Sequence, residues 1–286
     1  MRLKEIQQLF HKELDALFGP EETDQFFYLL LEEYCGLKAF TLALSPEHTA
    51  DKETEQKFFE ALSRLKTEQP IQQILGKTLF CDLEFKINKH VLIPRPETEE
   101  LVKWIENEVK DRSNDNPLKI LDIGTGSGCI AISLAKLLEK AEVHAMDVSA
   151  DALELARENA SHNKAEVTFI EADILKLEAL PEKYDIIVSN PPYVRRSEEK
   201  QMKANVLKYE PHLALFVEDE DPLLFYRRIT AMAVDNLMPG GCIFFEINQY
   251  LSSSMNKLLN EYGFTEIELR KDIFENDRMI RAVKAN

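Results

Sequence analysis

The chain has 286 residues, of which 44% are hydrophobic, and it carries a formal net charge of −16. This length and apolar content predict one large domain or two modest ones with a proper core, and no stretch approaches the roughly 20 consecutive apolar residues of a membrane span. Because phosphate binding usually rests on a basic surface, the acidic balance argues against duplex DNA or bulk RNA as the main partner.

The first seventy residues predict helices and no strands. Apolar side chains recur at helical spacing up to Gly19-Pro20, which ends the first helix. Two further helices are expected over about residues 23–34 and 51–67. No catalytic cluster is visible in this part of the sequence. We therefore expect residues 1–75 to form a packed helical N-terminal domain.

A short β-hairpin is expected after Pro70, which breaks the helical pattern. Its strands alternate apolar and polar residues over 78–80 and 83–87. We interpret residues 76–93 as a hairpin linker between two domains. Pro94 and Pro96 then open a helix, because the missing N–H of proline is harmless in a first helical turn.

From Leu118 onward the chain alternates expected strands and helices. The strands are expected at residues 119–122, 142–147, 167–170, 185–189, 242–247, 264–269 and about 279–283, and helices begin near Gly128, Ala150, Asp221 and Gln249. Such alternation predicts an α/β domain over residues 94–286, with a mostly parallel seven-stranded sheet covered on both faces.

A glycine-rich loop, Gly124-Thr125-Gly126-Ser127-Gly128, follows the first of these strands and opens a helix. Glycine lets the backbone turn tightly and approach a ligand, which then meets the N–H groups of the helix start. The strict dinucleotide fingerprint, GxGxxG, requires a third glycine where this chain has Cys129. The loop therefore predicts a cofactor site and disfavours NAD or FAD.

Acidic residues near the strand ends are candidate cofactor ligands. Asp147 ends the next strand about twenty residues past the loop, where an acid can bond ribose hydroxyls, although it could instead cap the helix that follows. Asp173 could accept a hydrogen bond from an adenine amino group, with Ile174 packing on the ring, or it could be an ordinary loop acid. Asp122 either holds the glycine loop or touches the cofactor amine.

The sequence Asn190-Pro191-Pro192-Tyr193 follows a buried strand and predicts the reaction centre. The two prolines fix φ and remove two donors, which leaves neighbouring carbonyls free to accept hydrogen bonds from a substrate NH₂ group. Asn190 adds a side-chain oxygen, and Tyr193 can pack against a flat acceptor. Positioning then supplies much of the catalysis, and no histidine base is required. Alternatively, these four residues could simply form a rigid turn after the strand.

Cysteine and histidine predict no metal centre. The four cysteines form no CxxC pair, and the six histidines show no paired ligand spacing. We expect Cys129 to be a small packed residue. The absence of a disulfide framework and of a secretory signal predicts a reduced cytoplasmic location without membrane attachment.

The glycine loop and the Asn-Pro-Pro-Tyr sequence together resemble the class I S-adenosylmethionine methyltransferases that modify amide or exocyclic nitrogens. Further segments resemble the HemK/PrmC family, the peptide chain release factor glutamine N5-methyltransferases. These segments are residues 69–76, 93–99, 210–211 and 214–215, together with the helical N-terminus. The resemblance covers nearly the whole chain and implies a Rossmann-like catalytic domain.

The resemblance implies a role for each motif. Residues 124–128 would hold the methionine part of S-adenosylmethionine, Asp147 the ribose, and Asp173 with Ile174 the adenine, with Asn190 also near the cofactor. Asn190 and the Pro191 carbonyl would bind the glutamine amide in the Gly-Gly-Gln motif of release factors, beside Pro192 and Tyr193. Arg95, Glu97 and Thr98 would lie near the pocket rim or simply start a helix. The N-terminal domain would dock the protein substrate.

Two positions depart from the family pattern, which usually has glycine after the Ala-Leu segment and glycine after Glu-x in the fifth strand. Here residues 216–221 contain no glycine, and Asn248 follows Glu246-Ile247. These departures affect the expected local loop geometry and not the expected chemistry.

Three other functions remain open from the residues alone. An N6-adenine or other nucleic-acid methyltransferase would use the same Asn-Pro-Pro-Tyr sequence but should have a basic cleft and a target-recognition domain. A non-catalytic adapter would not need an intact reaction loop. A dinucleotide oxidoreductase is disfavoured by Cys129. The leading hypothesis is a methyltransferase that modifies a release factor directly, without nucleic acid.

Overall fold

The computed structural model describes residues 1–110 and 117–285, and these form two units. The helical unit comprises Met1–Gly76 with Ala204–Tyr209, and the sheet unit comprises Lys77–Lys203 with the chain from Glu210 onward. The β-hairpin therefore belongs to the sheet unit. Within the described ranges, no helix has the length and apolar character needed to cross a membrane.

The helical unit is built around aromatic side chains. Its helices are α1 (Leu3–Phe18), α2 (Pro20–Cys35), α3 (Ala39–Leu44), α4 (Lys52–Leu65), α5 (Ile71–Leu75) and α9 (Ala204–Tyr209). Phe10, Phe27 and Phe58 are fully buried, with ring centroids 5.5–6.2 Å apart. The three long helices confirm the predicted helical N-terminus, because their apolar residues share one face.

Three short helices of this unit, α3, α5 and α9, were not expected from the sequence. Pro70 does end the preceding segment, but it also serves as the N-cap of α5. Helix α9 comes from far along the chain and joins this unit through Tyr209. The Tyr209 hydroxyl lies 2.8 Å from the Thr67 hydroxyl, and the Gln73 amide donates to the Tyr209 carbonyl at 2.7 Å.

The predicted hairpin is present as β1 (Lys77–Phe80) and β2 (Leu83–Lys86), which pair antiparallel. Cys81 and Asp82 form its turn, with φ values of 48° and 61°. Phe80 and Phe85 are buried in the core of the sheet unit.

The sheet unit contains seven strands in the order β10-β11-β9-β6-β3-β4-β5. They are β3 (Lys119–Ile123), β4 (Glu142–Asp147), β5 (Thr168–Glu171), β6 (Tyr184–Ser189), β9 (Leu237–Glu246), β10 (Phe264–Lys271) and β11 (Asp277–Lys284). Among the strands of this sheet that the structure describes, only β11 runs antiparallel to its neighbours. The mostly parallel seven-stranded sheet is therefore confirmed.

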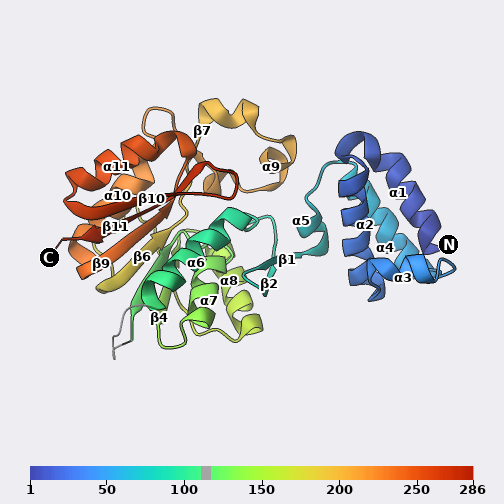
Figure 1. Cartoon of the computed structure of the whole chain (residues 1–286), viewed down its shortest axis with the longest axis horizontal. Coiled ribbons are helices and arrows are strands. Elements are labelled where there is room, and N and C mark those ends of the chain that lie inside the picture. The colour runs from blue at the N-terminus through green and yellow to red at the C-terminus, as the bar shows by residue number, and fades with distance from the viewer. Residues whose placement is uncertain (111–116, 286) are drawn as a thin grey trace. The chain divides into compact units, whose positions relative to one another are not determined.

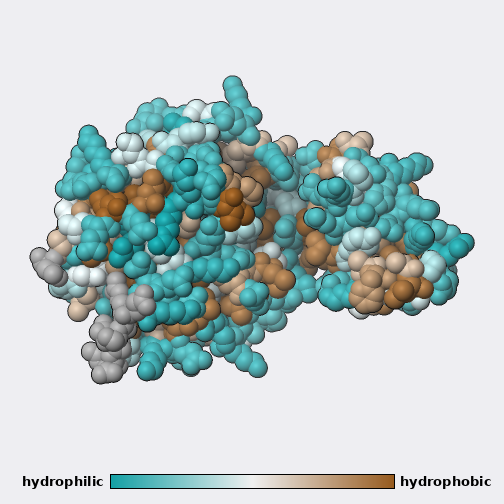
Figure 2. Space-filling view, viewed as in Figure 1, coloured by the Kyte–Doolittle hydropathy of each residue, from teal (hydrophilic) through white to brown (hydrophobic). Residues whose placement is uncertain are grey.

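Helices cover both faces of the sheet (Figure 1). One face packs against α6 (Pro96–Lys110), α7 (Cys129–Leu137) and α8 (Ala150–Asn163), and the other against α10 (Leu224–Asn236) and α11 (Ser252–Glu261). Strand side chains alternate between faces, so Ile120 joins the first core and Leu121 the second. The face of the molecule seen in Figure 2 is mostly hydrophilic, as the high charge predicts.

The strand register brings several loops to one edge of the sheet. Ile123 at the end of β3 pairs with Ser189 at the end of β6 and with Met146 on β4, and Asp147 pairs with Glu171 on β5. Because these parallel strands end at the same level of the sheet, the loops that follow them lie side by side, which is where open α/β sheets bind ligands.

Beyond β6 lie short elements that the sequence did not predict: β7 (Val194–Arg195), η1 (Arg196–Gln201), η2 (His212–Ala214), β8 (Phe216–Val217) and η3 (Gln249–Leu251).

Candidate active site

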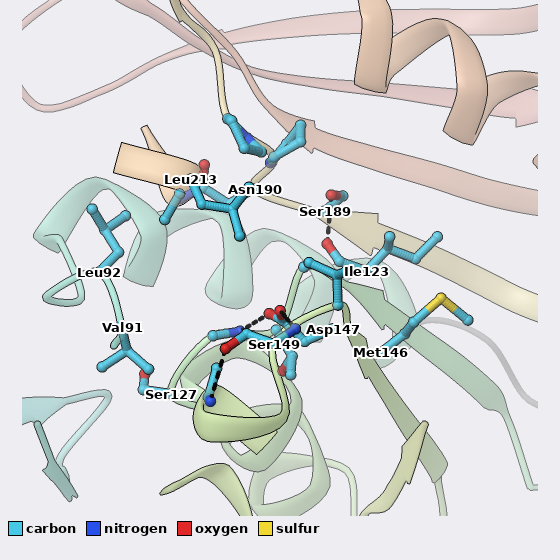
Figure 3. A pocket seen from close by; sticks show the side chains of 18 of the residues that line it. Val91, Leu92, Ile123, Ser127, Met146, Asp147, Ser149, Ser189, Asn190 and Leu213 are labelled. Carbon is cyan, nitrogen blue, oxygen red and sulfur yellow. Dashed lines mark hydrogen bonds between the residues drawn. The ribbon is translucent and has the colours of Figure 1, made fainter. Parts of the chain in front are cut away.

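A cavity of about 440 Å³ opens at this edge of the sheet (Figure 3). Most of the residues predicted for the site line it, namely Gly124, Thr125, Gly126, Ser127, Asp147, Asp173, Ile174, Asn190, Pro191 and Pro192. Figure 3 shows Asn190 and Leu213 on one side of the cavity, opposite Ser127, Asp147 and Ser149. Gly128 and Tyr193 do not line the cavity.

The glycine loop is fastened to β4 and does not point all its amides at the cavity. The N–H groups of Gly124 and Thr125 donate to the Met146 carbonyl at 2.8 and 3.0 Å, and that of Gly126 donates to Asp147 Oδ2 at 2.8 Å. Gly126 has φ +55°, and an added Cβ there would meet open space. The loop thus forms one wall of the cavity while its backbone conformation is held by the neighbouring strand.

Gly128 serves the packing of α7 and not the cavity. With φ +83°, it is the N-cap of that helix. A Cβ at this position would lie 2.8 Å from Ile132 Cδ1 and 3.2 Å from Ala156 Cβ. The residue is therefore glycine because α7 and α8 approach closely there.

Ser127 offers a polar atom to a ligand. Its side chain is buried and lines the cavity, and apart from the adjacent Cys129 thiol its hydroxyl has no hydrogen-bond partner in the described ranges. Burial raises the pKa of Cys129 to about 12, so this thiol is protonated and behaves as the small packed residue that the sequence predicted.

Asp147 joins the glycine loop to the start of α8. Its Oδ2 accepts from Gly126 N–H and its Oδ1 accepts from Ser149 N–H at 2.9 Å. Capping of α8 is done by Ser149, whose hydroxyl accepts from Ala152 N–H at 3.2 Å. Each carboxylate oxygen keeps a lone pair, so Asp147 can still accept a hydroxyl proton from a ligand in the cavity.

Asp173 and Ile174 line the cavity after β5. Oδ1 of Asp173 accepts from Leu175 N–H at 3.0 Å, and Oδ2 lies 3.0 Å from the Lys176 ammonium, whose hydrogen bond lowers the pKa of the carboxyl. Asp173 therefore organises its own turn as well as facing the cavity. Ile174 is buried among the apolar residues of the second core.

Asp122 holds the loop and does not line the cavity. Its Oδ2 accepts from the Thr125 hydroxyl at 2.6 Å. Burial, supported by the charge of Asp147 and opposed by the Thr125 hydrogen bond, raises the pKa of Asp122 to about 7. Of the two roles left open by the sequence, these contacts favour the structural one.

The reaction loop presents Asn190, Pro191 and Pro192 to the cavity. The Asn190 amide nitrogen lies 3.4 Å from the Thr98 hydroxyl. Tyr193 turns the other way, and its hydroxyl donates to Glu246 Oε1 at 3.0 Å. Burial, and then the charge of Glu246, raise the pKa of this phenol, so it remains a donor.

Behind the loop lies a buried polar group that the sequence reading missed. Glu246, at the end of β9, accepts from the Thr98 hydroxyl at 2.6 Å and from Tyr193. Thr98 and Glu246 are 3% and 2% exposed. Burial raises the pKa of Glu246, against the effect of these hydrogen bonds and of Arg278. An acid at the end of an otherwise apolar strand was the available signal.

A second missed contact joins two segments of the cavity rim. The buried Glu210 carboxylate accepts from the Ile93 amide at 3.1 Å and pairs with Arg95 at 2.5 Å. Arg95 and Pro211 both line the cavity. Of the three residues expected near the rim, Arg95 and Thr98 line the cavity and Glu97 does not. Helix α6 begins between Arg95 and Thr98, at Pro96.

The two departures from the expected family pattern are accommodated locally. Asn248 has φ −66°, which needs no glycine, and its amide donates to the Tyr193 carbonyl at 3.2 Å and to Glu198 at 3.0 Å. In the other segment, Asp219 accepts from the backbone and hydroxyl of Ser197. Both segments help to fix the chain that follows the reaction loop.

One group of potential metal ligands occurs in the described ranges, away from the cavity. It consists of Glu142, His144 and Glu182. The Lys119 ammonium pairs with both carboxylates, and His144 Nδ1 lies 2.9 Å from the Tyr184 hydroxyl. A cation already balances these acids, so we assign no metal to them.

Comparison with known proteins places both units in described families. The PrmC N-terminal domain family matches residues 9–76, and the methyltransferase small domain family matches residues 99–212. The release factor glutamine methyltransferase of Flavobacterium psychrophilum is 52% identical over 281 residues, covering 98% of this chain and 99% of that protein. The enzyme of the same name from Bacteroides thetaiotaomicron is 41% identical over 281 residues, with coverages of 98% and 99%.

The fold also resembles solved structures. A methyltransferase from Pyrococcus furiosus aligns with a TM-score of 0.53 at 18% identity, over 82% of this chain and 100% of that one. At this identity the likeness shows the fold, which is that of the Rossmann-like class I methyltransferases.

Proposed function

The chain belongs to the family of release factor glutamine methyltransferases, and we propose that it methylates the side-chain amide nitrogen of the glutamine in the Gly-Gly-Gln motif of peptide chain release factors. The methyl donor is S-adenosylmethionine. The observation that carries this proposal is the placement of Asn190 and Pro191 in the wall of the same cavity as the glycine loop and Asp147.

The cavity suits the donor in size and chemistry. About 440 Å³ lies within the range of small-molecule sites, which run from roughly 300 to 1,000 Å³. We propose that residues 124–127 border the methionine part, that Asp147 accepts from the ribose, and that Asp173 and Ile174 border the adenine. The Ser127 hydroxyl, which has no partner in the described ranges apart from the Cys129 thiol, is a polar partner for the same ligand. Gly128 supports the loop through the packing of α7.

The reaction loop suits an amide acceptor. Asn190 Oδ1 and the carbonyls beside Pro191 accept hydrogen bonds, which an NH₂ group can donate, and the prolines hold these acceptors in place. The bound donor supplies an activated methyl group. The chain's own contribution is to orient the amide nitrogen towards that methyl and to hold the amide protons at defined acceptors, which is catalysis by positioning.

Tyr193 has a supporting role in this proposal. Its hydroxyl is engaged with Glu246, and its ring packs at the edge of the second core. It therefore fixes the far end of the loop. Stacking of its ring on the flat acceptor stays a prediction, as does contact of Pro192 with the substrate.

The alternative to a protein substrate is a nucleic acid, as in the nucleic-acid methyltransferases. The net charge of −16 opposes binding to a phosphate backbone. The similarity to release factor enzymes covers both units of the chain, including the helical one. We therefore propose a protein substrate without direct nucleic-acid contact, in the cytoplasm, with the helical unit as its docking module.

The decisive experiment is label transfer from methyl-labelled S-adenosylmethionine to a purified release factor. We expect label in the intact factor and none in a variant with alanine in place of the Gly-Gly-Gln glutamine. Nuclease treatment should change nothing. Label that persists in the glutamine variant, or that migrates with nucleic acid, would overturn the proposal.

A further inference from the structure

We propose that Thr98 and Glu246 are positioning residues that set the orientation of the Asn190 amide, with its nitrogen turned inwards and its oxygen towards the acceptor. This inference rests on the proposed function, because it concerns the side chain that receives the substrate NH₂ group. It adds two residues from α6 and β9 to a reaction centre otherwise formed by the loop after β6.

The hydroxyl of Thr98 carries a single proton. A hydroxyl donates once and accepts through its lone pairs. Thr98 Oγ1 lies 2.6 Å from Glu246 Oε2, a short distance that is typical of a hydroxyl donating to a carboxylate. The proton of Thr98 is therefore committed to Glu246.

The hydrogen bond from Thr98 to Glu246 determines which end of the Asn190 amide faces Thr98. Having donated its proton, the hydroxyl can only accept, so the group 3.4 Å away must be the donor Nδ2. If the amide were turned over, two acceptor oxygens would face each other. The other end of the amide, Oδ1, has no hydrogen-bond donor in the described ranges and belongs to a residue that lines the cavity.

Glu246 is itself held so that it acts as an acceptor at both oxygens. Its second oxygen accepts from Tyr193 at 3.0 Å, and its own carbonyl accepts from the Tyr226 hydroxyl at 3.0 Å. The carboxylate is almost completely buried. Polar groups in such a position are ordered, because leaving one unpaired costs stability. The chain of hydrogen bonds thus runs from a fixed carboxylate through one hydroxyl to the catalytic amide.

The consequence for the reaction is specific. With Oδ1 towards the acceptor, Asn190 accepts one amide proton of the substrate. Without Thr98, the Asn190 amide can rotate and present its own NH₂ to the substrate NH₂, so that two donors face each other. The acceptor would still reach the cavity, but its nitrogen would be misaligned with the methyl donor.

The test compares Thr98→Val with Thr98→Ser. Valine keeps the shape and removes the hydroxyl, whereas serine keeps the hydroxyl and removes the methyl. We expect Thr98→Val to lower kcat on the release factor on the order of ten- to a hundredfold, since small misplacements at a reacting centre have effects of this size. KM for the factor and the Kd of S-adenosylmethionine should stay within about twofold, by comparison with the wild type. Thr98→Ser should restore most of kcat.

A purely structural role for Thr98 gives the opposite ranking. If packing were what matters, serine would be the worse substitution, because it leaves a small void in a buried site. Thr230→Val is the matched control, because Thr230 is fully buried on α10 and its hydroxyl has no partner in the described ranges. That variant should keep the wild-type kcat.

Glu246→Gln provides a second measurement if Thr98→Val does not fold. A glutamine offers one acceptor and one donor to two hydroxyls, so it can force Thr98 to accept and thereby release Asn190; we expect a similar loss of kcat. If the wild type methylates the factor and both variants match it, the orientation mechanism is wrong. If the wild type does not methylate the factor, the proposed function fails first.

Discussion

At the residue scale, the acids around the glycine loop differ in whether they hold the loop, line the cavity or do both. Asp147 is placed to do both, since its carboxylate accepts two backbone N–H groups and lines the cavity. Asp122 stands behind the loop and accepts a hydrogen bond from the Thr125 hydroxyl. We therefore expect different consequences when Asp147 and Asp122 are replaced, although both are acids near strand ends.

Asp147→Ala should weaken S-adenosylmethionine binding by about tenfold or more. Loss of a hydrogen bond to a charged group is worth roughly 1.5–3 kcal/mol, and the loop also loses its attachment to β4. Isothermal titration with the cofactor measures the affinity. Glu154→Ala, at an exposed position of α8, is the control and should bind normally. An unchanged affinity in folded Asp147→Ala would remove this residue from the site.

Asp122 should make the stability of the chain depend on pH. Its pKa is raised by burial from 3.8 to about 7, so the folded chain binds a proton that the unfolded chain releases near pH 4. The contribution of Asp122 to the free energy of unfolding is therefore largest below pH 4 and falls as the pH rises towards 7. From pH 5 to pH 8 this group should account for a loss of about 3 kcal/mol, at about 1.4 kcal/mol per pH unit.

Asp122→Asn tests this pH dependence, because asparagine keeps an oxygen for Thr125 and cannot ionise. Urea unfolding at pH 5 and at pH 8 should show a smaller difference for the variant than for the wild type. The exposed Asp151→Asn serves as the control and should behave as the wild type. Equal differences for Asp122→Asn and the wild type would mean that Asp122 does not titrate in this range.

The reaction loop shows how far a motif in the sequence can carry a prediction. Asn190 and the two prolines were predicted because their chemistry is local: fixed φ angles, freed carbonyls and an amide at the end of a strand. Thr98 was expected only near the pocket rim. Its contact with Glu246 was missed because the two residues are 148 positions apart, and only the folded chain brings them together. For the same reason, the sequence could not show that Tyr193 turns towards Glu246.

At the element scale, the long periodic segments were predictable and the short ones were not. All seven strands of the main sheet were expected, because apolar runs between turn signals record burial directly. Helices α3, α5 and α9 have five or six residues, too few to establish a helical period. The pair β7 and β8 depends on contacts between segments about twenty residues apart, which no local pattern records.

Gly128 tests the close packing of α7 on α8. Gly128→Ala should lower the free energy of unfolding by about 2–4 kcal/mol, because it adds left-handed strain to overpacking against Ala156. Thermal or urea unfolding measures the loss. Gly263→Ala is the matched control, since it has a similar φ of +80° with nothing within 4 Å of the added Cβ. Equal losses in the two variants would rule out a packing role for Gly128.

At the scale of the whole molecule, we propose that the catalytic chemistry and the recognition of the substrate reside in different units. The cavity is lined entirely by residues of the sheet unit. A pocket for a flat amide cannot by itself distinguish one glutamine from another. Discrimination therefore requires a wider surface, and the helical unit bears no chemistry of its own. Its match to the PrmC N-terminal domain family supports its assignment as the docking module.

We propose that exposed apolar side chains of the helical unit contact the release factor. Phe40 and Leu44 are 66% and 77% exposed, and a hydrophobic patch is visible over α3 in Figure 2. Replacing both with serine should raise KM for the release factor about tenfold or more, because each buried apolar side chain contributes roughly 1.5–3 kcal/mol. The Kd of S-adenosylmethionine should not change, since neither residue lines the cavity.

The control for this prediction is the double variant Ile273→Ser with Phe274→Ser. These two residues are each 65% exposed and lie in the sheet unit, so they match the first pair in character but not in location. Steady-state kinetics with release factor as the varied substrate measures both variants. If the binding energy gathered at α3 also helps to align the glutamine, its loss in the α3 variant should lower kcat as well as raise KM. Equal kinetics for the two variants would mean that α3 does not contact the release factor, and the docking surface would have to lie elsewhere on the chain.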